Sequence, residues 1–106
     1  MSARDPKVHV LVIRSWIEDL RPIRQALAAA GIRADLTTAD FEASLNAALT
    51  RGGYAVAIYD PRTPGLSRET VLACFRANKR DIPLIVLEDI ASLAERVVAA
   101  LASHVN

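Results

Sequence analysis

Short apolar runs alternate along this chain with segments of helical periodicity, and this alternation restricts the fold more than any other feature. Residues 8–13, 54–60 and 83–88 are apolar on both faces over most of their length. Such runs are typical of strands in a parallel sheet, because helices cover both faces of the sheet. A weaker alternating pattern over residues 32–36 predicts another strand near the sheet edge. The sequence therefore predicts an α/β domain with a parallel sheet.

Four segments with helical spacing of apolar residues accompany these strands. The first ends at Gly31, where glycine can terminate a helix. A helix that began at Ser15 would hold Pro22 in its interior at a cost of about 3 kcal/mol. We therefore expect this helix to begin near Asp19, with Pro22 in its first turn. The expected starts of the other three helices are Asp40, Ser67 and a capping box formed by Ser92 and Glu95.

Size and composition exclude several classes of protein. At 106 residues the chain is one domain. Its net charge of +1 gives no electrostatic case for direct nucleic-acid or membrane binding. Cys74 is the single cysteine, so no intrachain disulfide or cysteine metal site can form, and its helical position predicts a small buried hydrophobe. No apolar stretch precedes Val8 and no run approaches the ~20 residues of a membrane span. We expect a cytoplasmic domain without a cofactor.

Asp60 is the first candidate for a functional residue. It follows the third apolar run and opens the turn Pro61–Gly65, and open α/β sheets place their sites at the carboxyl ends of strands. Arg14 and Ser15 follow the first strand, where acids would be needed to complete a metal site. We therefore expect no divalent metal here. Arg14 is expected to form a partly shielded ion pair with Asp60 or with Glu88, and the sequence does not decide between them.

The layout resembles the receiver domains of bacterial two-component response regulators. The resemblance covers residues 7–106 and rests on Val10–Ile13, the helix to Gly31, Gly53–Asp60, Pro64–Gly65 and Ile82–Leu87. It implies a flavodoxin-like three-layer α/β sandwich with strand order 2-1-3-4(-5), in which the fifth βα unit is missing or truncated. Residues 1–106 would then be one receiver-like domain, the N-terminal part of a longer regulator. Receivers accept a phosphoryl group on an aspartate beside bound Mg²⁺, and the resemblance assigns that position to Asp60.

Four departures from the receiver pattern fall on this site. The acidic pair that holds Mg²⁺ is replaced by Arg14 and Ser15, and the hydroxyl residue that contacts the phosphoryl group is replaced by Glu88. Pro61 removes the backbone N–H that follows the aspartate. The lysine that closes the site would lie beyond Asn106. Phosphoryl transfer depends on the charge that Mg²⁺ neutralises. The resemblance therefore implies a pseudo-receiver, a regulatory module that is not an enzyme.

Such a module would act through protein–protein contact or dimerisation and control an output domain beyond residue 106, which binds DNA or RNA in this family. Two other functions stay open. Asp60 could be a working phosphoacceptor that receives phosphate from a histidine kinase, with Arg14 supplying the charge of the metal. The Arg14, Asp60 and Glu88 rim could also belong to a small enzyme or ligand-binding domain. Trp16 follows the first strand and either covers this pocket or packs on the surface.

The strand at residues 83–88 predicts self-association. If no fifth strand follows, this apolar strand lies at the sheet edge with unpaired backbone groups. We expect the last helix, residues 92–103, to cover one face of that strand but not to supply its ladder hydrogen bonds. The expected association is edge pairing or exchange of the C-terminal segment; alternatively, residues 103–106 fold back over the edge of a monomer. The predicted contact residues are Leu93, Val97, Val98 and Leu101.

Overall fold

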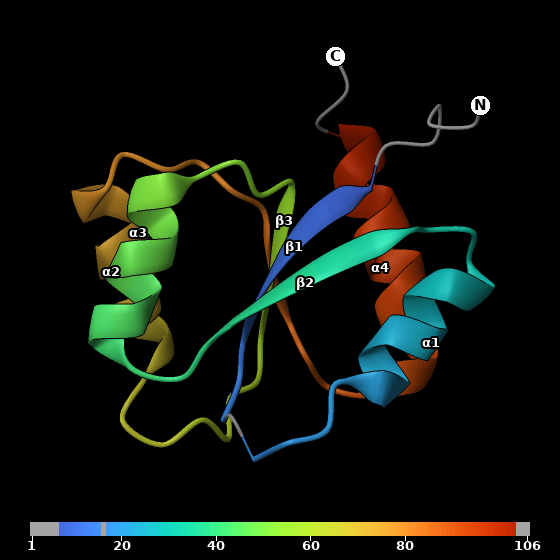
Figure 1. The fold of residues 1–106 in the computed structure, drawn as a ribbon, viewed down its shortest axis with the longest axis horizontal. Coiled ribbons are helices and arrows are strands. Elements are labelled where there is room, and N and C mark those ends of the chain that lie inside the picture. The colour runs from blue at the N-terminus through green and yellow to red at the C-terminus, as the bar shows by residue number, and fades with distance from the viewer. Residues whose placement is uncertain (1–6, 16, 104–106) are drawn as a thin grey trace.

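The structure, a computed structural model, describes residues 7–15 and 17–103. Within these ranges, strands and helices alternate from β1 to α4 (Figure 1). They are β1 (Val8–Ile13), α1 (Arg21–Ala29), β2 (Ala34–Ala39), α2 (Glu42–Arg51), β3 (Val56–Tyr59), α3 (Arg68–Ala77), β4 (Leu84–Val86) and α4 (Ile90–Ser103). All strand pairs are parallel and the sheet order is β2-β1-β3-β4. This confirms the predicted α/β fold with flavodoxin-like strand order.

Helices cover both faces of the sheet. Figure 1 shows α1 and α4 on one face and α2 and α3 on the other. Side chains of β1 alternate between the two layers: Val10 and Val12 pack under α1 and α4, whereas Leu11 and Ile13 pack under α2 and α3. All residues of β3 are buried, as a central parallel strand requires. The predicted weaker strand, β2, lies at one edge of the sheet.

The apolar runs predict where β3 and β4 lie but overestimate their lengths. The third strand is Val56–Tyr59 rather than residues 54–60, and the fourth is Leu84–Val86 rather than residues 83–88. A strand extends only as far as it pairs with a neighbouring strand. In the described sheet, β4 pairs with β3 over three residue pairs. The residues that flank these strands still make single backbone hydrogen bonds to the neighbouring strand: Ala55 to His9, Asp60 to Ile13, Pro83 to Ala57 and Leu87 to Tyr59.

Two helix starts agree with the sequence. Helix α1 begins at Arg21 with Pro22 in its first turn, so the proline is not in the helix interior. Helix α3 has Ser67 as its N-cap, and the Ser67 hydroxyl accepts a hydrogen bond from the Thr70 N–H at 3.2 Å. Cys74 on α3 is buried, as its spacing predicts.

Two other predicted helix starts are wrong. Asp40 does not cap α2; instead the hydroxyl of Ser44, the third residue of the helix, accepts from the N–H groups of Asp40 and Phe41 at 3.2 Å each. Ser92 and Glu95 do not form a capping box, because α4 already begins at Ile90. Asp89 caps it by accepting from the Ser92 N–H at 2.8 Å. In both cases the local motif is outweighed by a neighbouring side chain that satisfies the free N–H groups.

Helix α4 lies on the same face of the sheet as α1. A strand added beside β4 after α4 would require this helix on the α3 face, because about 98% of parallel crossovers are right-handed. Helix α4 instead packs its Leu93 and Val97 with Ile23 and Leu27 of α1. Under α3, the edge strand keeps two half-buried side chains, Leu84 and Val86. No helix within residues 7–15 and 17–103 is long and apolar enough to cross a membrane.

Candidate functional site

The candidate site lies at the carboxyl ends of β1, β3 and β4. Ile13 of β1 is in register with Tyr59 of β3, so the next residues, Arg14 and Asp60, leave the sheet side by side. The Asp60 N–H donates to the Ile13 carbonyl at 2.9 Å, which extends the ladder by one bond. A cavity of about 490 Å³ opens at this rim, lined by Arg14, residues 60–62 and residues 87–90.

Arg14 and Asp60 form an ion pair that is shielded from water. Arg14 Nε donates to Asp60 Oδ2 at 3.1 Å, and the two residues are only 8% and 3% exposed. The other two guanidinium nitrogens of Arg14 contact the segment that follows β1. Nη1 donates to the Asp19 carbonyl at 3.0 Å, and Nη2 lies 3.5 Å from the Glu18 carboxylate. The structure thereby answers what the sequence left open, since the partner of Arg14 is Asp60 and not Glu88.

Arg62 is a second cation on Asp60 that the sequence analysis missed. Its N–H donates to Asp60 Oδ1 at 2.9 Å, and its Nε and Nη2 donate to Oδ1 and Oδ2 at 3.3 and 3.2 Å. An aspartate that accepts from the N–H two residues later forms an Asx-turn, so the order Asp-Pro-Arg was an available signal. The Arg62 side chain is 72% exposed and Asp60 is buried, so the arginine covers the carboxylate from the solvent side.

The turn after Asp60 is fixed by hydrogen bonds to buried groups. The Thr63 hydroxyl lies 2.6 Å from the Asp60 carbonyl and 3.2 Å from the Ile13 carbonyl. The Tyr59 hydroxyl donates to the Leu66 carbonyl at 2.6 Å. These contacts tie the turn to both central strands, so the Asp60 carboxylate is held in one orientation. Burial raises the pKa of the Tyr59 hydroxyl, which keeps it protonated as a donor.

The Asp60 carboxyl has a lowered pKa. Burial by itself raises this pKa, but the hydrogen bonds and charge of Arg62, together with the charge of Arg14, outweigh burial. Asp60 is therefore a carboxylate at neutral pH, with its charge compensated by two guanidinium groups.

We expect the stability gained from Asp60 to depend on pH. Its pKa is lower in the folded than in the unfolded state, so the stabilisation is complete above the ordinary carboxyl pKa of about 3.9 and is lost as pH falls through the lowered folded value. Urea unfolding of wild type and Asp60→Asn should show a constant gap in free energy above about pH 5 that shrinks below about pH 4. Arg62→Ala should weaken this dependence. A gap that widens on acidification would contradict the assignment.

The other predicted rim residues lie near Asp60 without contacting its carboxylate. Glu88 is exposed and pairs with Arg96 of α4 at 3.7 Å. Pro61 lines the cavity, and the N–H it lacks is replaced by that of Arg62. Ser15 is half-buried and its carbonyl accepts from the Glu18 N–H at 3.0 Å. Trp16 lies outside the described residues, as do residues 104–106 of the predicted fold-back segment.

The predicted contact residues on the last helix do not share one surface. Leu93 and Val97 are 1% and 0% exposed and belong to the core, so their assignment to a contact surface is wrong. They project toward the sheet because α4 packs across it beside α1. Leu101 is half-buried against the same core. Only the fourth, Val98, is well exposed, at 45%.

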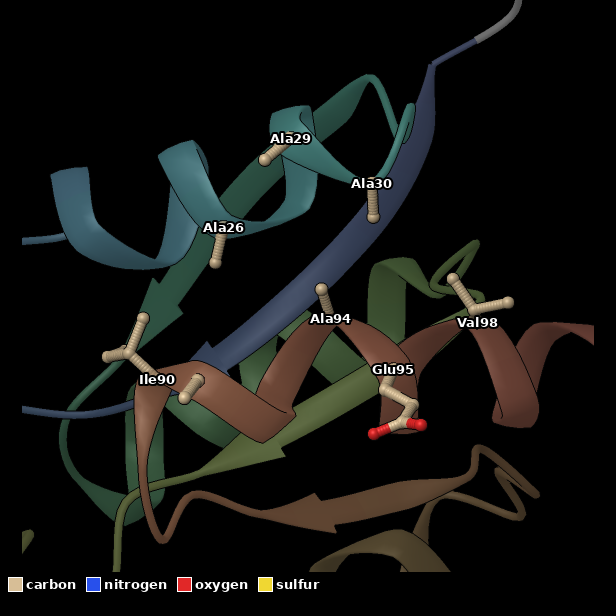
Figure 2. A pocket seen from close by; sticks show the side chains of 8 residues that line it. Ala26, Ala29, Ala30, Ile90, Ala94, Glu95 and Val98 are labelled. Carbon is tan, nitrogen blue, oxygen red and sulfur yellow. The ribbon is translucent and has the colours of Figure 1, made fainter.

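Val98 lines an apolar groove between α1 and α4 with a volume of about 620 Å³. Figure 2 shows Ala26 and Ala29 of α1, and Ala30 directly after it, across this groove from Ala94 of α4. Small side chains on both helices leave the groove shallow and open. Glu95 is the charged member of the lining.

Neither a metal-binding cluster in the described part of the chain nor a match to a known protein was found for this site. Among the described residues, no three His, Cys, Asp or Glu side chains are grouped so that they could hold a metal ion. The chain matches no protein-family model and no curated protein.

Proposed function

We propose that this domain is a non-catalytic regulatory module of signal transduction, a receiver-like domain that acts through protein–protein contact. One observation carries the proposal. The carboxylate at the phosphoacceptor position, Asp60, is 3% exposed, and both of its oxygens accept hydrogen bonds from arginine. A phosphoacceptor needs a free carboxylate oxygen in line with the phosphoryl donor and a cation on that donor. Here the oxygens are engaged and the cations belong to the chain itself.

The built-in cations have a consequence for regulation. In a metal-dependent receiver, Mg²⁺ and phosphate change the charge at the rim and thereby shift the balance between conformations. In this domain Arg14 compensates Asp60 permanently, and its own position is fixed by Glu18 and the Asp19 carbonyl. The rim therefore holds one charge state at neutral pH. Regulation would come from the binding of a partner, because only differential affinity for two states can shift their equilibrium.

A working phosphoacceptor is the second candidate function. The supporting observation is the exposure of Arg62, whose side chain is 72% exposed beside the cavity of about 490 Å³. If Arg62 swings away, one side of Asp60 opens to that cavity while Arg14 stays in place. This variant of the mechanism would use Arg14 in place of the metal.

Acetyl phosphate separates these two functions. We expect no phosphorylated species by intact mass spectrometry, with or without millimolar Mg²⁺, because Arg14 and Arg62 occupy the Asp60 oxygens. Trp16 fluorescence should likewise show no saturable response to Mg²⁺. The controls are Arg62→Ala, which uncovers Asp60, and Asp60→Asn, which removes the acceptor. A labelled species in wild type that disappears in Asp60→Asn would overturn the non-catalytic proposal.

A further inference from the structure

Among the strands that the structure describes, β4 lies at one edge of the sheet. The Ala57 N–H donates to the Pro83 carbonyl at 2.9 Å, and the Leu87 N–H donates to the Tyr59 carbonyl at 2.7 Å. Backbone groups alternate in direction along a strand, so residues with odd numbers face β3. Leu84 and Val86 therefore turn their N–H and C=O groups away from the sheet. An edge of this kind is a template for another strand.

Helix α4 covers part of this edge through one side chain. Arg96 Nη1 donates to the Val86 carbonyl at 2.7 Å and lies 3.7 Å from the Glu88 carboxylate. This is a side-chain contact to one carbonyl and not a hydrogen bond of the ladder. The Arg96 side chain is 38% exposed, so it can leave the carbonyl without opening the core. The backbone N–H and C=O of Leu84 and the backbone N–H of Val86 also point away from β3.

Charge differs between the two ends of this edge. The segment before β4 is basic, with Arg76, Lys79 and Arg80 against one acid, Asp81. The segment after β4 begins with two consecutive acids, Glu88 and Asp89. Two such edges attract when they run antiparallel, because each acidic end then lies beside a basic end, and they repel when they run parallel.

We propose that the partner of this edge is a second copy of the chain, paired antiparallel through β4 about a two-fold axis at Leu84. In this register Leu84 exchanges both hydrogen bonds with Leu84 of the partner subunit. The acidic segment after β4 then lies toward the basic segment before β4 of the partner subunit, and the half-buried side chains of Leu84 and Val86 from both copies lie on the α3 face of the joined sheet. Arg96 releases the Val86 carbonyl when the strands pair. A second copy of the chain would then be the partner through which the proposed regulatory module acts. That role in regulation rests on the proposed function, whereas the pairing itself is argued from the edge of the sheet.

The central bonds of this register can be removed without touching the chain's own ladder. Because the Leu84 N–H faces outward, Leu84→Pro deletes the bonds across the two-fold axis and leaves the bonds between β4 and β3. Leu84→Ala is the matched control for the lost side chain. We expect sedimentation equilibrium to give a concentration-dependent dimer for wild type and Leu84→Ala, and a monomer for Leu84→Pro.

Charge reversal tests the orientation independently of the proline. Lys79→Glu and Glu88→Lys should each weaken the dimer by about tenfold at low salt, since the two-fold axis repeats every contact. The combined variant, in which the two changed positions again carry opposite charges, should dimerise more tightly than either single variant. Arg24→Glu, the same change on exposed α1 away from the edge, should leave it unaltered. If Leu84→Pro does not fold, the charge-reversal variants still show whether the two edges pair antiparallel.

Two results would overturn the pairing. One is a wild type that stays monomeric at several hundred micromolar, and the other is a dimer that is insensitive to both Leu84→Pro and the charge reversals. Neither result bears on Asp60, whose carboxylate oxygens are bound by Arg14 and Arg62. Phosphorylation of Asp60 would in turn overturn the proposed function and leave the pairing intact, so the two failures are distinguishable.

Discussion

Arg14→Ala is expected to lower the free energy of unfolding by about 3 kcal/mol. Removing one partner of a buried ion pair leaves the other charge uncompensated, which costs about 3–5 kcal/mol. Arg62 remains on Asp60 in this variant, so we expect the lower end of that range. The Asp19 carbonyl and the Glu18 carboxylate also lose their contact with Arg14. Urea unfolding at neutral pH measures the loss.

A double-mutant cycle shows whether this loss comes from the pair itself. Arg14→Ala combined with Asp60→Ala should cost less than the sum of the two single changes, by about 0.5–3 kcal/mol. The matched control is Arg21→Ala, which removes an arginine from an exposed pair with Asp19 at 2.8 Å. Because this pair is exposed to solvent, the change should destabilise the domain far less than Arg14→Ala. Additive losses in the cycle would mean that Arg14 and Asp60 do not interact.

Leu93→Ala is expected to have a similarly large effect. Leu93 is 1% exposed and packs between α1 and the sheet, so its truncation leaves a cavity and costs about 2–5 kcal/mol. Val98→Ala, five residues further along α4, is the control. The Val98 side chain is 45% exposed, so its truncation should change the free energy of unfolding by no more than about 0.5 kcal/mol.

The comparison distinguishes a core residue from a contact residue. Thermal unfolding at several protein concentrations should show a lowered midpoint for Leu93→Ala at every concentration. If Leu93 were a contact residue instead, its replacement would weaken association and leave the monomer as stable as wild type. That outcome would contradict the packing of α4 against the sheet.

Fold class and the position of the site follow from local patterns in the sequence. Runs that are apolar on both faces, separated by helical periodicity, require a parallel sheet covered on both sides. Asp60 and Arg14 come directly after two such runs, and adjacent parallel strands end at the same rim. That Arg14 meets an acid at this rim is therefore within reach of the sequence, because it depends only on strand ends and on opposite charge.

The choice of partner for Arg14 was outside the reach of the sequence. Both Asp60 and Glu88 follow strands that end at this rim, but β3 lies between β1 and β4, so Asp60 is the nearer acid. Glu88 instead meets Arg96, which reaches the rim from α4. The order of strands, and not the local sequence, separates the two acids.

The face that α4 occupies also depends on tertiary structure. Its apolar residues repeat at a spacing that fits packing on either face, and the sequence does not distinguish a core stripe from a contact surface. Packing beside α1 buries Leu93 and Val97, leaves Val98 exposed and brings Arg96 to the β4 edge. Local sequence determined which residues form helix and strand, because periodicity is a property of neighbours along the chain. The face of α4, the partner of Arg14 and the cover of the edge were decided by contacts between segments that are distant in sequence.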